Sequence, residues 1–291
     1  MASLKDVRLK IAGVRKTRQI TKAMYMVASA KLRSAQLRIE RFRPYADKFS
    51  EMLVSLRGTA EDAAHPLLAE RPEPASVGIV IATSDRGLCG SFNAGIITAA
   101  LKFAEENRAA GRQVRFYCLG RKCCDAVRTR GGETAMAVIG RMNAVDFPLA
   151  SEVGVAIMED FLNGHVDEVH MFYGEFISLA RQRPAGIKLL PAGGGASGPE
   201  DAGAAEDYIY EPAAGVLLGE LLPRYVKAQV YRGLLDTAAG ENAARMQAMD
   251  NATRNCDDMA DALTLLFNKT RQAGITNELI DIVGGVEALK G

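Results

Sequence analysis

The first 43 residues carry a long helical repeat of apolar positions. Steps of three and four residues alternate along this segment, and ten of the twelve positions visited are apolar. The positions are Leu4, Val7, Ile11, Val14, Arg18, Thr21, Tyr25, Ala28, Leu32, Ala35, Ile39 and Phe42. A repeat sustained over this length predicts one long helix whose apolar seam packs against another helix in a coiled coil.

Proline does not end this predicted helix. The apolar spacing resumes after Pro44 with Phe49, so we expect a kink or a brief irregularity at the proline rather than a stop. Gly58 and Pro66 then mark the end of the pattern. The first segment is therefore expected to be a helix over residues 1–58.

The C-terminal part repeats the pattern. The same stepping visits fourteen positions, of which ten are apolar. They are Leu235, Ala238, Asn242, Arg245, Met249, Ala252, Cys256, Met259, Leu263, Leu266, Thr270, Ala273, Asn277 and Ile280. A helix from about 212 to about 289, on the order of 100 Å long, needs a partner for its seam in water. We expect segment 207–291 to pair with 1–58 as an antiparallel two-helix shaft.

The middle of the chain has a different period. Strands and helices are expected to alternate in it, as strands 77–82, 114–119 and 167–176 and helices 93–108, 122–129 and 150–162. This alternation predicts a parallel, Rossmann-like sheet with crossover helices, in a globular α/β domain over residues 74–206. Residues 192–203 are rich in glycine and predict a flexible, exposed loop.

Charge is distributed unevenly along the chain. Residues 1–43 hold 12 Lys or Arg against 2 acids, a net charge of +10, whereas the other 248 residues hold 24 bases against 33 acids, a net charge of −9. With only two acids, the segment cannot neutralise its positive charge through i,i+4 ion pairs within its own helix. We expect an acidic partner: nucleic acid, anionic lipid or an acidic protein surface.

Composition excludes several classes of protein. Hydrophobic residues make up 48% and charged residues 24%, which excludes general disorder. The longest apolar run, 213–219 if glycine is counted, is far shorter than the roughly 18 residues that a membrane-spanning helix needs. The apolar period continues past residue 30, so no targeting signal is expected. The five cysteines form no pair of Cys-x-x-Cys units and are expected to be reduced thiols.

The turn at residues 83–93 has the position of a phosphate-binding loop. It follows the first expected strand and opens a helix, but it contains neither Gly-x-Gly-x-x-Gly nor the Gly-Lys-Ser/Thr of a P-loop. A tight turn with Asp85 as a local hydrogen-bonding residue is therefore favoured over a nucleotide site, although a role for residues 84–90 beyond structure stays open.

Candidate catalytic and metal-binding residues are few. The three histidines, His65, His165 and His170, lie beside no nucleophile motif and are expected at the surface or in turns. Cys123 and Cys124 are neighbours on an expected helix and should point in different directions, so we expect no shared metal ion and no cofactor. The absence of an acid/base pair, triad or ligand set argues against an autonomous enzyme.

Four motifs resemble the gamma subunits of F-type ATP synthases, of the bacterial type. Residues 20–32 read ITKAMYMVASAKL, residues 84–90 read SDRGLCG, residues 208–212 read YIYEP, and residues 268–279 read NKTRQAGITNEL. The motifs follow the family's order over essentially the whole chain. The departures are small, because the family commonly has Glu at the position of Tyr25 and a second Gly at that of Ser91.

The resemblance implies a non-catalytic rotor. In that family the terminal helices form a left-handed coiled coil inside a hexamer of three alpha and three beta subunits, and the α/β domain sits with epsilon on the membrane ring of c subunits. Proton-driven rotation then forces each catalytic beta site through open and closed states. The basic first helix would meet acidic loops of the beta subunits, and the apolar end at 280–286 would turn as a bearing.

The resemblance also implies which residues touch the partners. Contacts to the alpha-beta hexamer are expected from Met24, Arg245, Arg271, Gln272, Thr276 and Glu278. Contacts to the membrane ring are expected from Tyr208 and Glu211. Met24 lies one step off the seam, so helix packing is an equal alternative for it. The expected location is the cytoplasmic face of a bacterial inner membrane, with only indirect membrane contact.

Two other functions remain as alternatives. A basic coiled-coil protein that binds nucleic acid or acts as a scaffold would use the first helix, and its affinity for DNA would fall steeply with salt. A nucleotide-dependent α/β enzyme would use the turn at 84–90. The sequence contains no base-reading module for the former and no complete fingerprint for the latter.

Overall fold

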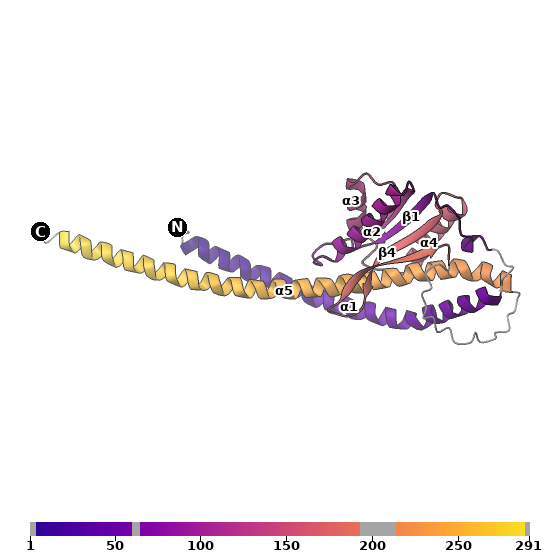
Figure 1. The fold of residues 1–291 in the computed structure, drawn as a ribbon. Helices are drawn as coiled ribbons and strands as arrows, with labels where there is room; N and C mark the ends of the chain where they lie inside the picture. Colours follow the sequence, from indigo (N-terminus) through magenta and orange to yellow (C-terminus); the bar gives the residue numbers. More distant parts are fainter. Residues whose placement is uncertain (1–3, 60–64, 193–213, 289–291) are drawn as a thin grey trace. The chain divides into compact units, whose positions relative to one another are not determined.

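A computed structural model describes residues 4–59, 65–192 and 214–288. The chain forms two compact units, one of Met1–Ala28 with Met246–Gly291 and one of Ser29–Arg245. Two long helices contribute to both, α1 (Leu4–Thr59) and α5 (Ala214–Ala288) (Figure 1). α1 continues through Pro44, because a single missing N–H is tolerated where the packing of flanking apolar residues holds the helix.

In the first unit, the beginning of α1 pairs antiparallel with the second half of α5. Thr21 and Thr253 share a hydrogen bond of 2.8 Å between their hydroxyl oxygens. One turn before Thr21, Arg18 forms an ion pair with Asp257, one turn after Thr253. Because partners advance along one helix as they recede along the other, the two helices run in opposite directions.

The second unit is built on a five-stranded sheet in the order β3-β2-β1-β4-β5. The strands in chain order are β1 (Ser76–Ala82), β2 (Gln113–Leu119), β3 (Thr134–Val138), β4 (Glu168–Phe176) and β5 (Gln182–Leu190). Neighbouring strands from β3 to β4 are parallel, and β5 is antiparallel to β4. The expected fold, an α/β domain with a parallel sheet and two long terminal helices, is confirmed, with one antiparallel edge strand added.

Two apolar layers cover the sheet. On one face, Ile79 and Ile81 pack with α2 (Phe92–Ala109) and α3 (Arg121–Thr129). On the other, Val80 packs with α4 (Phe147–Leu162), the 3₁₀ turn η1 (Pro66–Leu68) and the first half of α5. Alternate residues of β1 point to opposite faces, so a strand buried on both sides reads as a continuous apolar run.

Within this unit, the second half of α1 runs antiparallel to the first half of α5. The ring of Phe42 meets that of Tyr231 edge-on at 4.9 Å between centroids. The ring of Phe49 stacks on that of Tyr225 at 6.2 Å. Phe49 and the neighbouring Met52 belong to the same apolar layer as α4, so α1 contributes to the core of the α/β unit.

The predicted domain boundaries at 58, 74 and 207 stay predictions. Residues 60–64 and 193–213 lie outside the described residues. Most of the expected flexible loop at 192–203 also lies outside the described residues, so it stays a prediction. Its first residue, Ala192, is buried, and its backbone N–H donates to the Leu67 carbonyl at 2.8 Å.

Candidate functional site

The seam predicted for α1 is confirmed. All twelve positions from Leu4 to Phe42 are buried or half-buried. Ala28 and Leu32 are among the most deeply buried, with exposed fractions of 1% and 3%. The apolar repeat thus marks the face of α1 that packs against the protein.

Beyond Cys256, the seam predicted for α5 is confirmed at Leu263 and Thr270, which are half-buried. It is wrong at the other positions, which are exposed: Met259, Leu266, Ala273, Asn277 and Ile280. Met259 and Leu266 are 55% and 46% exposed, whereas Ala260 and Phe267, each one residue later, are half-buried. A four-residue step from Cys256 starts the observed seam. The shift has a geometric reason: a strict 3.5-residue repeat drifts about 20° per heptad against a helix of 3.6 residues per turn.

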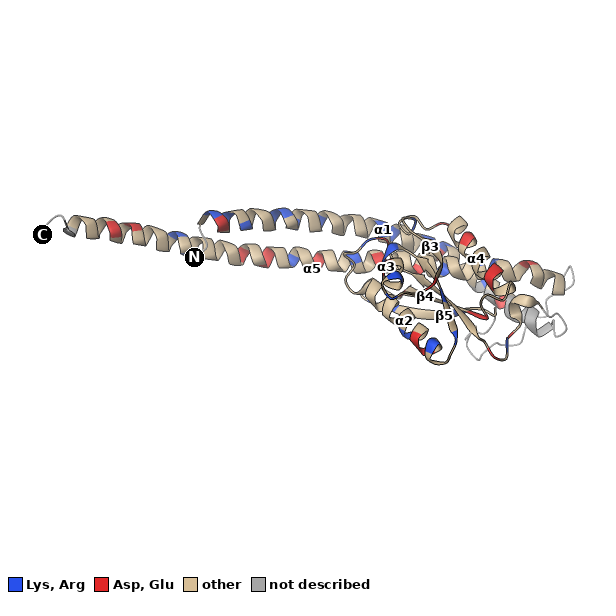
Figure 2. Cartoon of the chain, turned by 90° about the horizontal axis from the view of Figure 1, so that it is seen from above, with Lys and Arg blue, Asp and Glu red and all other residues tan. Residues whose placement is uncertain are grey.

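The opposite face of α1 is basic. Figure 2 shows the Lys and Arg positions in blue along the ribbon of α1, and within residues 5–43 every Lys and Arg side chain except that of Arg18 is exposed. Arg18 is half-buried and pairs with Asp257. The charge asymmetry seen in the sequence is therefore a surface property, available to an anionic partner.

The predicted contact residues near the C-terminus lie on the surface of α5. Arg271, Gln272, Thr276 and Glu278 are exposed, and the Thr276 hydroxyl donates to the Gln272 carbonyl at 3.0 Å. Every described residue of 275–286 is exposed. The large apolar side chains among them are Ile275, Leu279, Ile280, Ile282, Val283 and Val286. Solvent-exposed apolar side chains in this number mark an interaction surface.

The other predicted contacts have different surroundings. Met24 is half-buried in α1. The Arg245 side chain is only 12% exposed, and its guanidinium donates to Glu241 Oε1 at 2.6 Å and to the Gly87 carbonyl at 3.1 Å. Tyr208 and Glu211 lie outside the described residues.

The hydrogen bond from Arg245 to the Gly87 carbonyl links the turn at 84–90 to α5. Burial raises the pKa of Glu241, and the adjacent Arg245 cation opposes that shift. A buried carboxylate needs such a partner, because an uncompensated charge in the interior is costly. The link between Glu241, Arg245 and Gly87 was not found from the sequence, although the i,i+4 spacing of Glu and Arg was visible.

The turn itself is closed by internal hydrogen bonds. Ser84 N–H donates to Asn93 Oδ1 at 3.0 Å, and the Asn93 amide donates to Ser84 Oγ at 2.7 Å. Asp85 accepts from the backbone N–H groups of Arg121, Gly140 and Met142 at 2.9 to 3.1 Å. Asp85 thus has the predicted structural role, but the prediction that its hydrogen bonds are local is wrong, because these partners lie 36 to 57 residues away in the sequence.

The histidines take part in local structure. His65 caps η1, accepting from the Leu67 N–H at 3.2 Å, and His165 is exposed beside Asp160 at 2.9 Å. His170 is different: it lies in strand β4, half-buried against the ring of Phe103. The surface-or-turn prediction is wrong for His170, because β4 lies inside the sheet and Phe103 of α2 covers this side of it.

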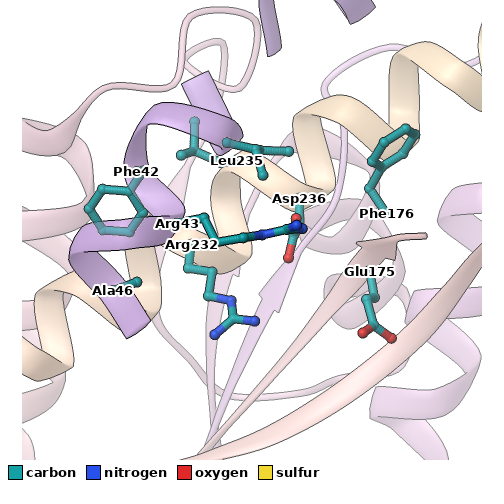
Figure 3. Close-up of a pocket in the computed structure, with 9 residues that line it drawn as sticks. Phe42, Arg43, Ala46, Glu175, Phe176, Arg232, Leu235 and Asp236 are labelled. Atoms are coloured by element: carbon teal, nitrogen blue, oxygen red, sulfur yellow. The ribbon is translucent and has the colours of Figure 1, made fainter. Parts of the chain in front are cut away.

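The second unit has a cavity of about 60 Å³ between α1, β4 and α5. Figure 3 shows the residues that line it. Arg43, Glu175, Arg232 and Asp236 bring charges to it among apolar neighbours. Burial raises the pKa of Asp236 to about 6, an effect that Arg232 and Arg43 oppose and Glu175 reinforces. A cavity of this size holds no more than a few water molecules.

Three thiols also meet in the second unit. The sulfur atoms of Cys118, Cys123 and Cys124 all lie within 4.8 Å of one another. The geometric step in the sequence interpretation, that Cys123 and Cys124 point too far apart to share a ligand, is therefore wrong. The first turn of α3 tilts both sulfur atoms toward Cys118 on β2.

None of the described helices is long and apolar enough to cross a membrane.

The profile of the ATP synthase family matches residues 3–289. The ATP synthase gamma chain of Nitratidesulfovibrio vulgaris (strain Hildenborough) is 58% identical, and the alignment covers all of both chains. The chain belongs to the ATP synthase gamma chain family. A more distant bacterial relative, the gamma chain of Desulforapulum autotrophicum, is 47% identical over 99% of this chain and 100% of its own.

A solved structure has the same fold. In the Euglena gracilis mitochondrial ATP synthase structure of OSCP/F1/c-ring, one chain matches with a TM-score of 0.67. The match covers 98% of this chain and 94% of that one, at 21% identity. The resemblance stated from the four sequence motifs is thereby confirmed at the level of the family and the fold.

Proposed function

We propose that the chain is the rotor subunit of a proton-translocating F-type ATP synthase, carrying torque between the membrane ring of c subunits and the alpha-beta hexamer. One observation carries the proposal: a family match over residues 3–289 in a chain whose two terminal helices pair antiparallel. The nucleic-acid and scaffold alternative receives no support from the relatives.

The chain is a non-catalytic subunit of this complex. Its contribution is mechanical: paired helices with an interlocked apolar seam resist twisting, since close-packed side chains transmit strain. The link from Gly87 through Arg245 to α5 would make the α/β unit and the helix turn together. The beta subunits would supply the catalytic residues.

The proposed contacts to the hexamer are Met24, Arg245, Arg271, Gln272, Thr276 and Glu278. The exposed positions on α5 support this assignment, whereas the buried ion pair of Arg245 favours a role within the chain that positions its neighbours. The basic face of α1 would meet acidic loops of the beta subunits. Tyr208 and Glu211 are proposed to contact the c-ring.

The proposed partners are the alpha, beta and epsilon subunits and the c-ring, and the proposed location is the cytoplasmic face of a bacterial inner membrane. The bacterial sources of the similar gamma chains support this location. Membrane contact would be indirect, through the ring of c subunits.

Reconstitution tests the proposal. The full chain is mixed with alpha and beta subunits of a bacterial ATP synthase, and gel filtration and magnesium-ATP hydrolysis are measured. We expect one chain per hexamer and hydrolysis well above that of the alpha-beta mixture alone. Separate elution of a folded chain, without stimulation, would contradict the rotor role.

Matched variants test the contact surface in the same assay. Arg271→Ala with Gln272→Ala should weaken co-elution or stimulation, because both side chains are exposed on α5. Lys102→Ala is the control, since Lys102 lies on α2 with its side chain 77% exposed. Equal behaviour of the two variants would remove Arg271 and Gln272 from the proposed contact.

A further inference from the structure

The thiols of Cys118, Cys123 and Cys124 form a compact group between β2 and α3. Cys118 and Cys123 are completely buried, whereas Cys124 is half-buried and gives the group its access from solvent. Their sulfur atoms lie within 4.8 Å of one another. In the described part of the chain, this group contains only thiols, with no imidazole or carboxylate ligand.

Thiol sulfur is a soft donor and prefers soft metal ions and metalloids. A site whose side-chain donors are all thiols disfavours magnesium, calcium and manganese, and it leaves the thiophilic elements as candidates. Among these, the choice depends on charge, because the complex forms in the interior of the α/β unit.

The surroundings disfavour a charged complex. Three backbone carbonyl oxygens face the Cys123 sulfur, which donates to Gly120 O at 3.1 Å and lies 3.4 Å from both Ile81 O and Leu119 O. The Cys124 thiol donates to the Cys118 carbonyl at 3.7 Å. Burial raises the pKa of Cys123, and the hydrogen bond with Cys123, followed by burial, raises that of Cys124. Carbonyl oxygens beside buried sulfur atoms disfavour a net negative charge at this site.

A divalent metal on three thiolates would carry a net charge of −1, and a monovalent one a net charge of −2. Only a trivalent centre gives a neutral complex. We propose that Cys118, Cys123 and Cys124 form a binding site for trivalent arsenic or antimony, taken up as the neutral hydroxide.

The binding step is balanced without a redox partner. Arsenous acid, As(OH)₃, reacts with three thiols to give As(SR)₃ and three water molecules. Three As–S bonds form while three As–O and three S–H bonds break, and each thiol proton leaves with a hydroxide as water. Arsenic remains trivalent. The half-buried Cys124 thiol would react first, and the two buried thiols would follow.

The bound centre would join β2 to α3 covalently. Because the fold holds the three thiols together, arsenite should bind the folded chain more tightly than the unfolded chain and raise its thermal unfolding midpoint. The test uses the purified full chain, under reducing conditions that are then removed, with sodium arsenite as the probe. We expect one arsenic per chain by elemental analysis, a higher midpoint, and protection of three thiols from alkylation that leaves only Cys89 and Cys256 reactive after unfolding.

Matched variants locate the site. The double variant Cys89→Ala with Cys256→Ala keeps the thiol group and should bind arsenite as the parent chain does. Cys124→Ala should lose the midpoint shift and weaken binding at least tenfold, and its far-ultraviolet circular dichroism should show a folded chain. Cys118→Val, which fills the space of the buried thiol, should do the same.

Three results would overturn the proposal. The first is that the folded parent chain binds no arsenite. The second is full binding by Cys118→Val, which would mean that two thiols suffice. The third is tighter binding of zinc or cadmium than of arsenite at neutral pH, because the neutrality argument would then be wrong.

Discussion

The buried ion pair between Glu241 and Arg245 has an exposed counterpart on the same helix. Arg245 and Glu241 are 12% and 5% exposed, whereas Arg254 and Asp250, with the same i,i+4 spacing, are 74% and 41% exposed. Arg245→Met leaves a buried carboxylate without its partner, so we expect a loss of about 3 kcal/mol in the free energy of unfolding. Chemical denaturation measures it.

Two variants control for this effect. Arg254→Met should cost less than about 0.5 kcal/mol, because exposed pairs contribute little. Adding Glu241→Met to Arg245→Met should restore most of the loss, since the uncompensated charge is removed with it. Equal losses for Arg245→Met and Arg254→Met would mean that burial of the pair does not matter.

Asp236 makes the stability of the α/β unit depend on pH. Burial raises the pKa of its carboxyl from the ordinary 3.8 to about 6 in the folded chain. The folded state therefore holds the proton more tightly than the unfolded state, and its stability falls as pH rises from about 4 to 6. At pH 7, Asp236→Asn should increase the free energy of unfolding by on the order of 2 kcal/mol.

The pH profile distinguishes this cause from simple repacking. The advantage of Asp236→Asn over the parent chain should shrink as pH is lowered from 7 toward 4, because the parent carboxyl becomes neutral. Measuring both chains at each pH cancels the contributions of all other titrating groups. An advantage independent of pH would contradict the assignment.

At the scale of elements, the turn between β2 and α3 depends on one glycine. Gly120 has a φ of +105°, and a Cβ there would overlap the carbonyl oxygen of Thr83. Gly120→Ala should therefore cost at least about 3 kcal/mol, because strain and a backbone clash add. Gly140 has a φ of +85° with open space around it. Gly140→Ala should lower the free energy of unfolding by only about 1–2 kcal/mol. Thermal unfolding of both variants tests this ranking, and an equal or larger loss for Gly140→Ala would contradict it.

Sequence patterns predicted the buried strands of the sheet and missed its two edge strands, β3 and β5. β1 and β2 were visible because strands buried on both faces are continuously apolar. β3 was missed because most of its side chains are exposed, and β5 because Pro184 and Gly186 interrupt it. Edge strands are specified by pairing, which a single sequence does not display.

For the candidate site, the sequence predicted the features that repeat along one helix and missed those that join distant residues. Local periodicity placed the seam of α1 correctly because each heptad repeats the same signal. In α5 beyond Cys256, the half-buried positions 260, 267 and 274 each lie one residue after a predicted position, and the alanine and glycine at 260 and 274 give only a weak apolar signal. The thiol group and the link from Arg245 to Gly87 join residues distant in sequence, so only the fold brings them together.

At the scale of the whole molecule, Met24 tests the rotor role. Met24→Lys adds a cation to a segment that already has 12 bases and 2 acids within its first 43 residues. If this helix turns past acidic loops, the new cation would favour some rotational positions over others. We expect less proton pumping per ATP hydrolysed in a reconstituted complex, with the chain still folded.

Met24→Leu is the matched control, because it keeps the volume and the apolar character of the half-buried side chain. It should pump protons as the parent does. Unchanged pumping by Met24→Lys would leave Met24 with a packing role alone.

The antiparallel helix pair in the first unit joins residues that the ribosome makes early with residues that it makes late. Thr21 and its partner Thr253 are 232 residues apart. A ribosome that adds about 5–20 residues per second leaves the start of α1 without this partner for tens of seconds at the slower rate. During that interval the apolar seam is open to other chains, and the basic face keeps nascent copies apart by mutual repulsion. The same charges that suit an acidic partner would thus protect the helix before its partner exists.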